Sequence, residues 1–550
     1  MNAKSIFIFF ACMLMAEMVA CGQTTCLWTN GVSNAGSGNW GDVSAWNGST
    51  WADAGAPPHN IARFSATNAS YTVTNNLGTV FVGGLDFIRG PATLRGGTIR
   101  FGNNATNKNS SSQQATIYSI LSADPGVDVA FGPGNQNWSI YTNLNIQGKI
   151  LIDIGSAAYS FFLQADNVFT NTSASIILQR VKLDCRSTSG QNLTNRTVVL
   201  GGGVIWVNTG TLDLGDVRFD SLYTAGGTLS GNNKQINIRG RLIGNATNAV
   251  LSVSGANVDL YNPNAYTGGL ALSIATACSV TMRATHALPL NTVVTNNGYL
   301  RLGTGSVSVV QELAGLAGTN GLVIGNASSV STLVIINTTN YTYTGRLGGT
   351  NTTQNNIALT KTGAGVLTLS GTNTYAGATI ISNGVLRLGT NGCLLGSPVV
   401  SVAGTAVFDV SALNGAFTVV PNQMLTGSGT VTGVVTIANG GVWAPGGVDQ
   451  VGSLIARSSV TNNGTLLVDV NMYGSCDVAD IWGDLVLGAG SVLNVAGSPC
   501  EGLEYTIAVT DGVVTGSFAS DNLPAGWYVE YGAKSIVLKG PVAGGMVLIR

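Results

Sequence analysis

The sequence predicts an all-β protein built as a β-solenoid, and three observations support this prediction. Charged residues make up 9% of the 550 residues, against roughly 25% in an average soluble domain. Glycine is abundant, with 75 residues, and 45% of the chain is hydrophobic. Short sequence motifs recur along the chain. Each has the residues of a tight turn followed by alternating apolar and polar residues. Helical arrays need more Glu, Lys and Arg, and disordered chains are less hydrophobic, so both classes are excluded.

The charge balance argues against two classes of partner. Lys and Arg total 24, Asp and Glu total 25, and the formal net charge is −1. A near-neutral chain lacks the basic surface by which proteins bind nucleic acid or anionic lipid. We therefore expect no nucleic-acid partner.

Residues 1–22 have the composition of a secretory signal peptide. Lys4 supplies positive charge, and residues 5–16 form an apolar run too short to span a bilayer. Small residues before Gln23 fit ordinary cleavage, whereas Met-Val-Ala-Cys at 18–21 resembles a bacterial lipobox that would place a lipid on Cys21. No later segment has the length of a transmembrane helix. The sequence thus predicts a protein that is secreted or held on the outer cell surface.

Internal repeats indicate how the solenoid is built. Residues 357–390 read IALTKTGAGVLTLSGTNTYAGATIISNGVLRLGT, and residues 249–272 follow the same plan. The motif SNGVLRLGT at 382–390 has an earlier counterpart, NNGYLRLGT, at 296–304. Stacked coils lie about 4.8 Å apart and each buries the apolar face of its neighbour. About twenty coils of ~22–25 residues would make one rod on the order of 100 Å long.

The alternation of residues in the strand after each turn predicts which side chains face the interior. In residues 385–388 the alternation places Leu386 and Leu388 on one side of the strand and Val385 and Arg387 on the other. The preceding Asn-Gly pair supplies the positive φ that a tight turn requires. We expect the leucines to face the interior.

Residues 358–390 closely resemble the autotransporter-associated β-strand repeat, also called the passenger-associated transport repeat, and residues 249–304 resemble it more weakly. The resemblance implies a right-handed parallel β-helix on or outside the cell of a Gram-negative or related bacterium. The family shares no catalytic residues, so none is carried over. An autotransporter ends in a membrane β-barrel. This chain ends at Leu-Ile-Arg without one, so we expect a different export route.

The repeats and the resemblance together suggest a domain organisation. The expected parts are a signal peptide at 1–22, a Trp-rich N-terminal cap with the first coils at 23–90, a β-solenoid at 91–500 with repeat copies at 249–304 and 357–390, and a C-terminal β module at 501–550 that caps the other end.

One charged stretch allows an alternative function. Two sets of charges alternate with apolar residues, so the members of each set share a strand face: Lys182, Asp184 and Arg186, then Asp216, Arg218 and Asp220. Stacked in one groove, they would suit a carbohydrate-active enzyme of the polysaccharide lyase or hydrolase type. We favour an exposed strand face whose cross-strand ion pairs stabilise little.

A tryptophan cluster near the N-terminus also has two interpretations. Four rings lie within 24 residues: Trp28, Trp40, Trp46 and Trp51. They would either cover the open apolar end of the solenoid or stack on sugars as a glycan-binding site. Capping is the interpretation that we favour.

Metal and disulfide chemistry have little support. The cysteines lack the spacing of a zinc site, and the chain has two histidines. Asp477, Asp480 and Asp484 lack the glycine and distal glutamate of a calcium loop, so turn and strand roles are expected. Cys476 and Cys500 are the one pair nominated for a disulfide. We expect no metal and no cofactor.

The sequence therefore predicts an exported, non-enzymatic, rod-like protein of the cell surface or matrix, either structural or an adhesin. We expect it to be a monomer. Extracellular polysaccharide or surface components are the expected partners.

Overall fold

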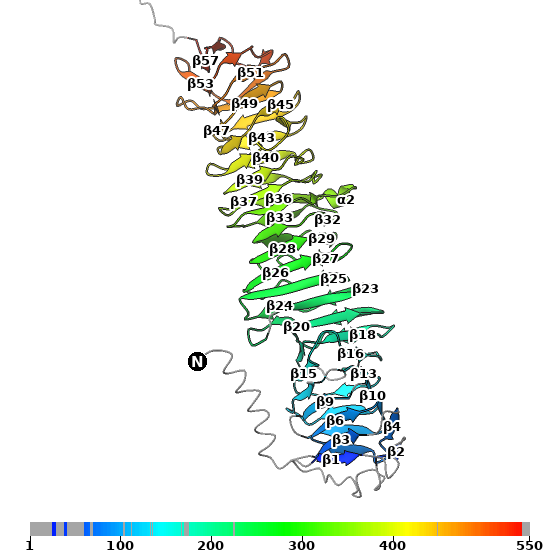
Figure 1. Ribbon diagram of the computed structural model, residues 1–550. Coiled ribbons are helices and arrows are strands. Elements are labelled where there is room, and N and C mark those ends of the chain that lie inside the picture. Colours follow the sequence, from blue (N-terminus) through cyan, green and yellow to red (C-terminus); the bar gives the residue numbers. More distant parts are fainter. Residues whose placement is uncertain are drawn as a thin grey trace, which may run out of the picture. The chain divides into compact units, whose positions relative to one another are not determined.

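The computed structural model of the chain describes residues 25–28, 38–40, 60–65, 70–102, 105–111, 113–132, 134, 136–166, 168–169, 175–223, 226–447 and 449–541. The chain forms two compact units, residues 1–271 and 272–550. Each is built of stacked strands (Figure 1). The border lies within β26 (Gly269–Ile274). No helix among the described residues is long and apolar enough to cross a membrane.

The coils of unit 1 contribute parallel strands to three faces, here called faces 1, 2 and 3, and the strands of face 3 form two separate ladders. Face 1 contains β1 (Thr25–Trp28), β3 (Ile61–Ser65), β6 (Gly84–Arg89), β9 (Ala105–Asn109), β12 (Val129–Phe131), β15 (Ile150–Asp153), β17 (Ile176–Gln179), the start of β20 (Val198–Val207), β22 (Val217–Phe219) and β24 (Leu242–Gly244).

Face 2 contains β2 (Gly38–Asn39), β4 (Tyr71–Thr74), β7 (Ala92–Arg95), β10 (Ala115–Ile117), β13 (Trp138–Ile140), β16 (Ser160–Leu163), β18 (Lys182–Cys185), the end of β20, and the starts of β23 (Gly226–Ile238) and β25 (Asn248–Leu260). Face 3 contains β5 (Thr79–Val82), β8 (Thr98–Phe101), β11 (Ile120–Ala123), β14 (Leu144–Asn145), β19 (Gln191–Leu193), β21 (Thr211–Leu214) and the ends of β23 and β25.

The long strands of unit 1 turn corners between faces. In β20 the pairing register breaks between Gly201 and Val204, and Gly202 has a φ of 88°. In β23 it breaks between Ser230 and Lys234, next to Asn233 with a φ of 56°. An extra residue with a left-handed backbone bends a strand without ending it. One strand therefore serves two faces.

Aromatic rings fill part of the interior of unit 1. Trp40, Phe64, Phe87 and Trp138 are 0% exposed. Their ring centroids lie 5.5 Å apart for Trp40 and Phe64, 5.1 Å for Phe64 and Phe87, and 5.5 Å for Phe87 and Trp138. Edge-on and stacked contacts of this length add to the stability gained by burying the rings.

Unit 2 has the same parallel construction. Its first coils contain β27 (Ser279–Met282), β28 (Thr292–Asn296), β29 (Tyr299–Gly305), β31 (Gly315–Ala317), β32 (Leu322–Ala327) and β35 (Arg346–Leu347). A ten-stranded ladder follows: β30 (Val310–Leu313), β33 (Ser331–Ile335), β36 (Ile357–Lys361), β38 (Thr379–Ile381), β40 (Val399–Val402), β43 (Met424–Gly427), β46 (Val442–Pro445), β49 (Thr465–Val470), β52 (Val492–Gly497) and β55 (Ser520–Asp521).

A second ten-stranded ladder contains β34 (Tyr341–Tyr343), β37 (Val366–Leu369), β39 (Val385–Leu388), β41 (Val407–Asp409), β44 (Thr430–Thr432), β47 (Ser453–Ala456), β50 (Val478–Ile481), β53 (Glu504–Thr510), β57 (Ser535–Lys539) and β56 (Tyr528–Tyr531). The third has five strands: β42 (Phe417–Val419), β45 (Val435–Ile437), β48 (Val460–Asn462), β51 (Leu485–Leu487) and β54 (Val514–Thr515). At the end of the second ladder β57 pairs antiparallel with β53 and β56. The one helix among the described residues is α2 (Thr352–Asn355).

The prediction of an all-β solenoid of parallel coils is confirmed. The orientation predicted for β39 is also confirmed, because Leu386 and Leu388 are 0% exposed. Arg387 faces outward and its Nε lies 2.7 Å from a carboxylate oxygen of Asp409 on the next coil. Apolar residues alternate with outward polar ones because each strand covers the interior with one face only.

Gly384 precedes β39 and allows two coils to approach closely. Its φ is 67°, and a Cβ at this position would lie 2.3 Å from the carbonyl oxygen of Gly363. We expect Gly384→Ala to destabilise unit 2 by about 2–4 kcal/mol, from positive φ and from displacement of the neighbouring backbone. Chemical unfolding followed by circular dichroism measures this loss.

Gly305→Ala is the matched control for Gly384→Ala. Gly305 has a φ of 55° and no atom within 4 Å of its Cβ position, so the φ penalty alone, about 1 kcal/mol, applies. Equal losses in the two variants would contradict the close approach of the coils.

Candidate functional site

Asp184 is the centre of the predicted charged face, and the structure places it on β18 in face 2. Its side chain is 3% exposed, and its carboxylate oxygens lie 3.2 Å from Nε of Arg186 and 3.9 Å from Nζ of Lys182. Lys182 begins β18 and Arg186 directly follows its last residue. The favoured prediction of exposed cross-strand pairs is therefore wrong here, because the carboxylate is buried and its partners are two residues away on either side along the chain.

Aromatic rings on the neighbouring coils explain this burial. Asp184 pairs in register with Phe162 on β16 and with Trp206 on β20. The guanidinium of Arg186 lies 4.1 Å from the Phe162 ring centroid, and Nζ of Lys182 lies 5.3 Å from the Trp206 ring centroid. The cations cover the rings and the rings cover the carboxylate, so the three coils form one small charged and aromatic cluster.

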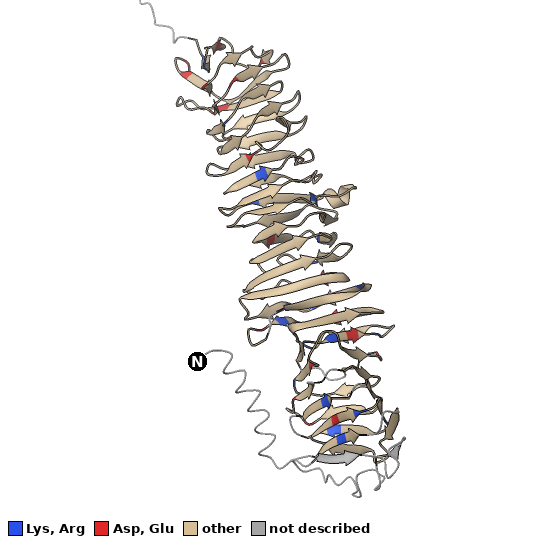
Figure 2. Cartoon of the chain, viewed as in Figure 1, with Lys and Arg blue, Asp and Glu red and all other residues tan. Residues whose placement is uncertain are grey.

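The second predicted set lies on another face. β22 carries Arg218, which pairs with Val199 at the start of β20, whereas Asp184 pairs with Trp206 at its end. The corner between Gly201 and Val204 separates these two pairings. Figure 2 shows the charged residues scattered along the chain. The enzymatic alternative required one groove for both sets, and the bend in β20 contradicts it by assigning them to faces 2 and 1.

The members of the second set have local roles. An Asp216 carboxylate oxygen accepts a 2.8 Å hydrogen bond from the Arg241 backbone N–H. Nε of Arg218 lies 3.4 Å from an Asp220 carboxylate oxygen, and Asp220 also accepts a hydrogen bond from the Leu222 backbone N–H. These contacts stabilise turns and one strand face.

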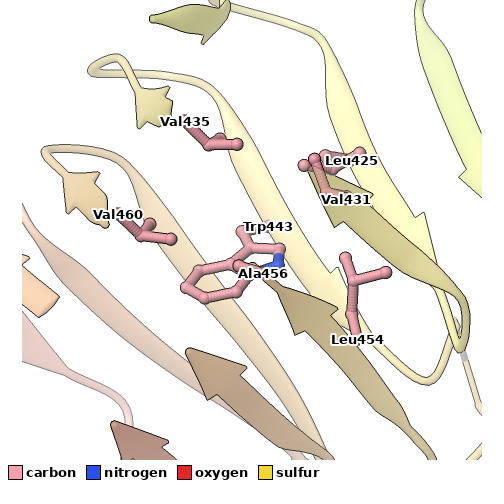
Figure 3. Close-up of a pocket in the computed structure, with 7 residues that line it drawn as sticks. All are labelled: Leu425, Val431, Val435, Trp443, Leu454, Ala456 and Val460. Atoms are coloured by element: carbon pink, nitrogen blue, oxygen red, sulfur yellow. The ribbon is translucent and has the colours of Figure 1, made fainter. Parts of the chain in front are cut away.

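An apolar hollow surrounds Trp443 inside unit 2. Figure 3 shows its indole ring among Leu425, Leu454 and other apolar side chains. The space does not admit a water molecule, so it is a packing defect of the core. Within the described residues, no three His, Cys, Asp or Glu side chains converge as a metal site would require.

The structure describes part of the tryptophan cluster. Trp40 is 0% exposed and contacts Phe64, which leaves no ring face for a sugar. Trp28 ends β1, but its side chain, Trp46, Trp51 and the proposed lipidation site Cys21 lie outside the described residues. The capping role stays a prediction, as do the boundaries proposed at residues 90 and 500.

The nominated disulfide is absent, because Cys476 and Cys500 are free thiols. Cys476 Sγ donates to the carbonyl oxygen of Thr506 and Cys500 Sγ to that of Glu501. Asp477 is 0% exposed and accepts hydrogen bonds from the backbone N–H groups of Gly452 and Asp469. Burial is the main cause that raises the pKa of Asp477 to about 7.

Lys361 is a buried residue to which the sequence analysis assigned no role. It ends β36 and is 0% exposed, as are Ile357 and Leu359 on the same face. Its Nζ donates to the carbonyl oxygens of Thr362, Gly363 and Asn383 at 2.9, 2.8 and 3.2 Å. The alternation of Ile357, Leu359 and Lys361 was the signal that could have placed it inward.

The coils that contain Lys361 match a known repeat. Residues 359–388, which include β37 and β38, match the passenger-associated-transport-repeat. This chain carries a passenger-associated transport repeat. The resemblance noted from the sequence is thereby confirmed over two coils of unit 2, where Lys361 links β36 to the turn before β39 through Asn383.

Comparisons with whole proteins show weaker similarity than the repeat does. The crystal structure of the Haemophilus influenzae Hap adhesin aligns with 88% of this chain and 64% of that chain, at 11% sequence identity and a TM-score of 0.30. This chain therefore spans just under two thirds of the length of the adhesin structure. A comparison with curated proteins finds no match.

Asp184 provides a test of the buried cluster. Asp184→Ala leaves Lys182 and Arg186 without their carboxylate, so we expect unit 1 to lose about 1–3 kcal/mol of unfolding free energy. Asp216→Asn keeps an oxygen for the Arg241 N–H, so we expect a loss of less than about 0.5 kcal/mol. Chemical unfolding of both variants measures the difference, and losses of the same size would refute the burial of Asp184.

Lys361 provides a pH test within the transport repeat. Burial lowers the pKa of Lys361 from 10.5 to about 8. Between these values the unfolded chain binds more protons than the folded chain, so the stability of unit 2 rises as pH increases from 8 to 10.5. We expect a contribution on the order of 2–3 kcal/mol, measured as the unfolding midpoint against pH.

Two lysine variants isolate this contribution. Lys361→Met should remove the rise, whereas Lys534→Met should keep it, because Lys534 is exposed and donates to one backbone carbonyl oxygen. The same pH profile for wild type and Lys361→Met would contradict the assignment.

Proposed function

We propose that the protein is an exported, non-enzymatic β-helix protein that acts at the cell surface or in the extracellular matrix, as a structural component or an adhesin. The observation that carries the proposal is the passenger-associated transport repeat at residues 359–388, placed within stacked parallel coils. By its description the repeat is associated with passengers and their transport.

The construction of the coils is suited to that role. Each coil buries its apolar side chains against its neighbours, and its outward residues form columns along three faces. A stack of this kind displays a broad lateral surface, and its paired strands resist proteases because their backbone groups are already hydrogen-bonded. The lateral surface, more than an enclosed cavity, is the natural place for attachment.

The charged cluster supports this proposal over the enzymatic alternative. The carboxylate of Asp184 is covered by Phe162, Trp206 and two cations, whereas a general acid or base must reach the proton that it transfers. Asp216 and Asp220 flank β22, which pairs with the start of β20, whereas Asp184 pairs with the end of β20 after its corner. Asp184 therefore shares no face with Asp216 and Asp220, and the two sets do not form the common groove that the enzymatic alternative required.

The test is to locate the protein on intact producing bacteria. We expect an epitope-tagged chain to be labelled by external antibody and removed by external protease, while a cytoplasmic marker stays protected. Deletion of residues 2–22 should leave it inside the cell. Cys21→Ser separates the two modes of processing, because release into the medium indicates a lipid anchor. Recovery of the wild type from the cytoplasm alone would overturn the proposal.

A further inference from the structure

One outward column of face 2 has a repeating sequence and a repeating geometry. Arg95, Tyr118, Tyr141 and Gln164 follow one another at intervals of 23 residues. The residues before them pair in register, as Leu94 with Ile117, Ile117 with Ile140, and Ile140 with Leu163. On the next coil Leu163 pairs with Cys185, which precedes Arg186. Together Arg95, Tyr118, Tyr141, Gln164 and Arg186 form what we call the face 2 column.

The two tyrosines of the column stack on each other and are partly exposed. Their ring centroids are 4.5 Å apart with an interplanar angle of 16°, and the guanidinium of Arg95 lies 4.3 Å from the Tyr118 centroid. Tyr118 is 38% exposed and Tyr141 is 40% exposed. Each ring covers one face of the other, and Arg95 covers the outer face of Tyr118, so three of the four ring faces are covered.

Polar groups of the column are available to a ligand. Among the described residues, Arg95 forms no ion pair, and the hydroxyls of Tyr118 and Tyr141 and the side-chain amide of Gln164 form no hydrogen bond. The column thus offers one unneutralised guanidinium, two hydroxyls and one amide on successive coils. Such groups are satisfied by water until a polar ligand replaces it.

The charge of the column is positive although the whole chain is nearly neutral. At its far end Arg186 and Lys182 share the single carboxylate of Asp184, which is 3% exposed, while the side chains of Lys182 and Arg186 are 30% and 39% exposed. Asp166, two residues after Gln164, is a second and exposed anion at this end, and it accepts a hydrogen bond from the Ser187 hydroxyl. With Arg95 at the other end, three accessible cations therefore face one buried and one exposed anion, and the balance stays positive. The column therefore complements a ligand with repeated negative charges.

We infer that the face 2 column binds an acidic polysaccharide, and this inference deepens the proposed surface function. Guanidinium groups pair with carboxylates in a forked geometry, and tyrosine hydroxyls and amides bond to sugar hydroxyls. Neighbouring coils are about 4.8 Å apart, which is close to the length of one pyranose ring. An extended chain of uronic acids along the column therefore meets a polar group at each coil.

Other polyanions fit the column less well. Single-stranded nucleic acid binds by stacking bases on open aromatic faces, but the faces between Tyr118 and Tyr141 are covered by each other. An anionic membrane requires an apolar surface beside the cations, whereas the column presents hydroxyls and an amide. Because the contacts are exposed and charged, binding should weaken as salt rises.

The test uses the full chain and polygalacturonate as the probe, with dextran as a neutral polymer, in calorimetric titrations at low and physiological salt. We expect binding to polygalacturonate and none to dextran. Arg95→Gln should weaken binding about three- to tenfold through loss of one charge-assisted contact. Tyr118→Phe with Tyr141→Phe keeps the stacked rings but removes both hydroxyls, and it should weaken binding by a similar factor.

Arg457→Gln is the matched control. Arg457 lies 4.8 Å from the centroid of Trp482, a ring that is 51% exposed, and forms no ion pair among the described residues. Arg457→Gln removes one positive charge, as Arg95→Gln does, but from unit 2, so we expect the affinity for polygalacturonate to be unchanged. An equal loss in Arg457→Gln would mean general electrostatic attraction and would overturn the site.

Three further outcomes would also overturn the inference. They are no binding of polygalacturonate by the wild type, unaltered binding by the column variants with native circular dichroism, and tighter binding of single-stranded DNA than of polygalacturonate. The cell-labelling experiment is independent. If the protein is exposed on the cell surface but does not bind polygalacturonate, only this inference is contradicted. If it binds polygalacturonate but stays in the cytoplasm, only the proposed function is contradicted.

Discussion

In-register parallel pairing is the constraint on which the rest of this structure depends. A strand such as β39 satisfies its backbone through β37 on one side and β41 on the other, and its inward leucines are covered by the same neighbours. A single coil could bury neither its apolar face nor its polar backbone. The glycine turns follow from this constraint, because bulkier residues at positions such as Gly384 would hold the coils apart.

The same constraint turns outward residues into columns. When register is kept from coil to coil, residues at equivalent positions stand about 4.8 Å apart whatever their chemistry. Arg387 and Asp409 form a cross-strand ion pair in this way, as do Arg63 and Asp86. In such a protein recognition is a property of a column, and chemistry that needs groups converging from several sides has few places to occur.

Buried polar groups in unit 2 serve the corners of the coils. The ammonium group of Lys361 contacts three carbonyl oxygens, and the carboxylate of Asp477 contacts two backbone N–H groups. Corner residues leave backbone groups that no ladder can pair, and a buried unpaired group is costly. Both side chains carry a perturbed pKa because they perform this role away from solvent.

The sequence by itself determined the fold class, the turns and the inward side of individual strands, since a period of two and a required positive φ are local properties. It located the transport repeat and contained the signal for Lys361, whose alternation with Ile357 and Leu359 was visible. It also contained the 23-residue interval of Arg95, Tyr118 and Tyr141, but gave no reason to attach meaning to it. Which residues share a face depends on the length of every coil and on each corner.

Only the tertiary structure decided that Asp184 is buried by Phe162 and Trp206, and that Asp216 lies on another face. Both facts depend on residues one coil away and on the irregular pairing between Gly201 and Val204. One extra residue at such a corner shifts all later positions relative to the coil below. Local pattern therefore fixes whether a side chain points in or out, and the accumulated register between coils fixes what it meets.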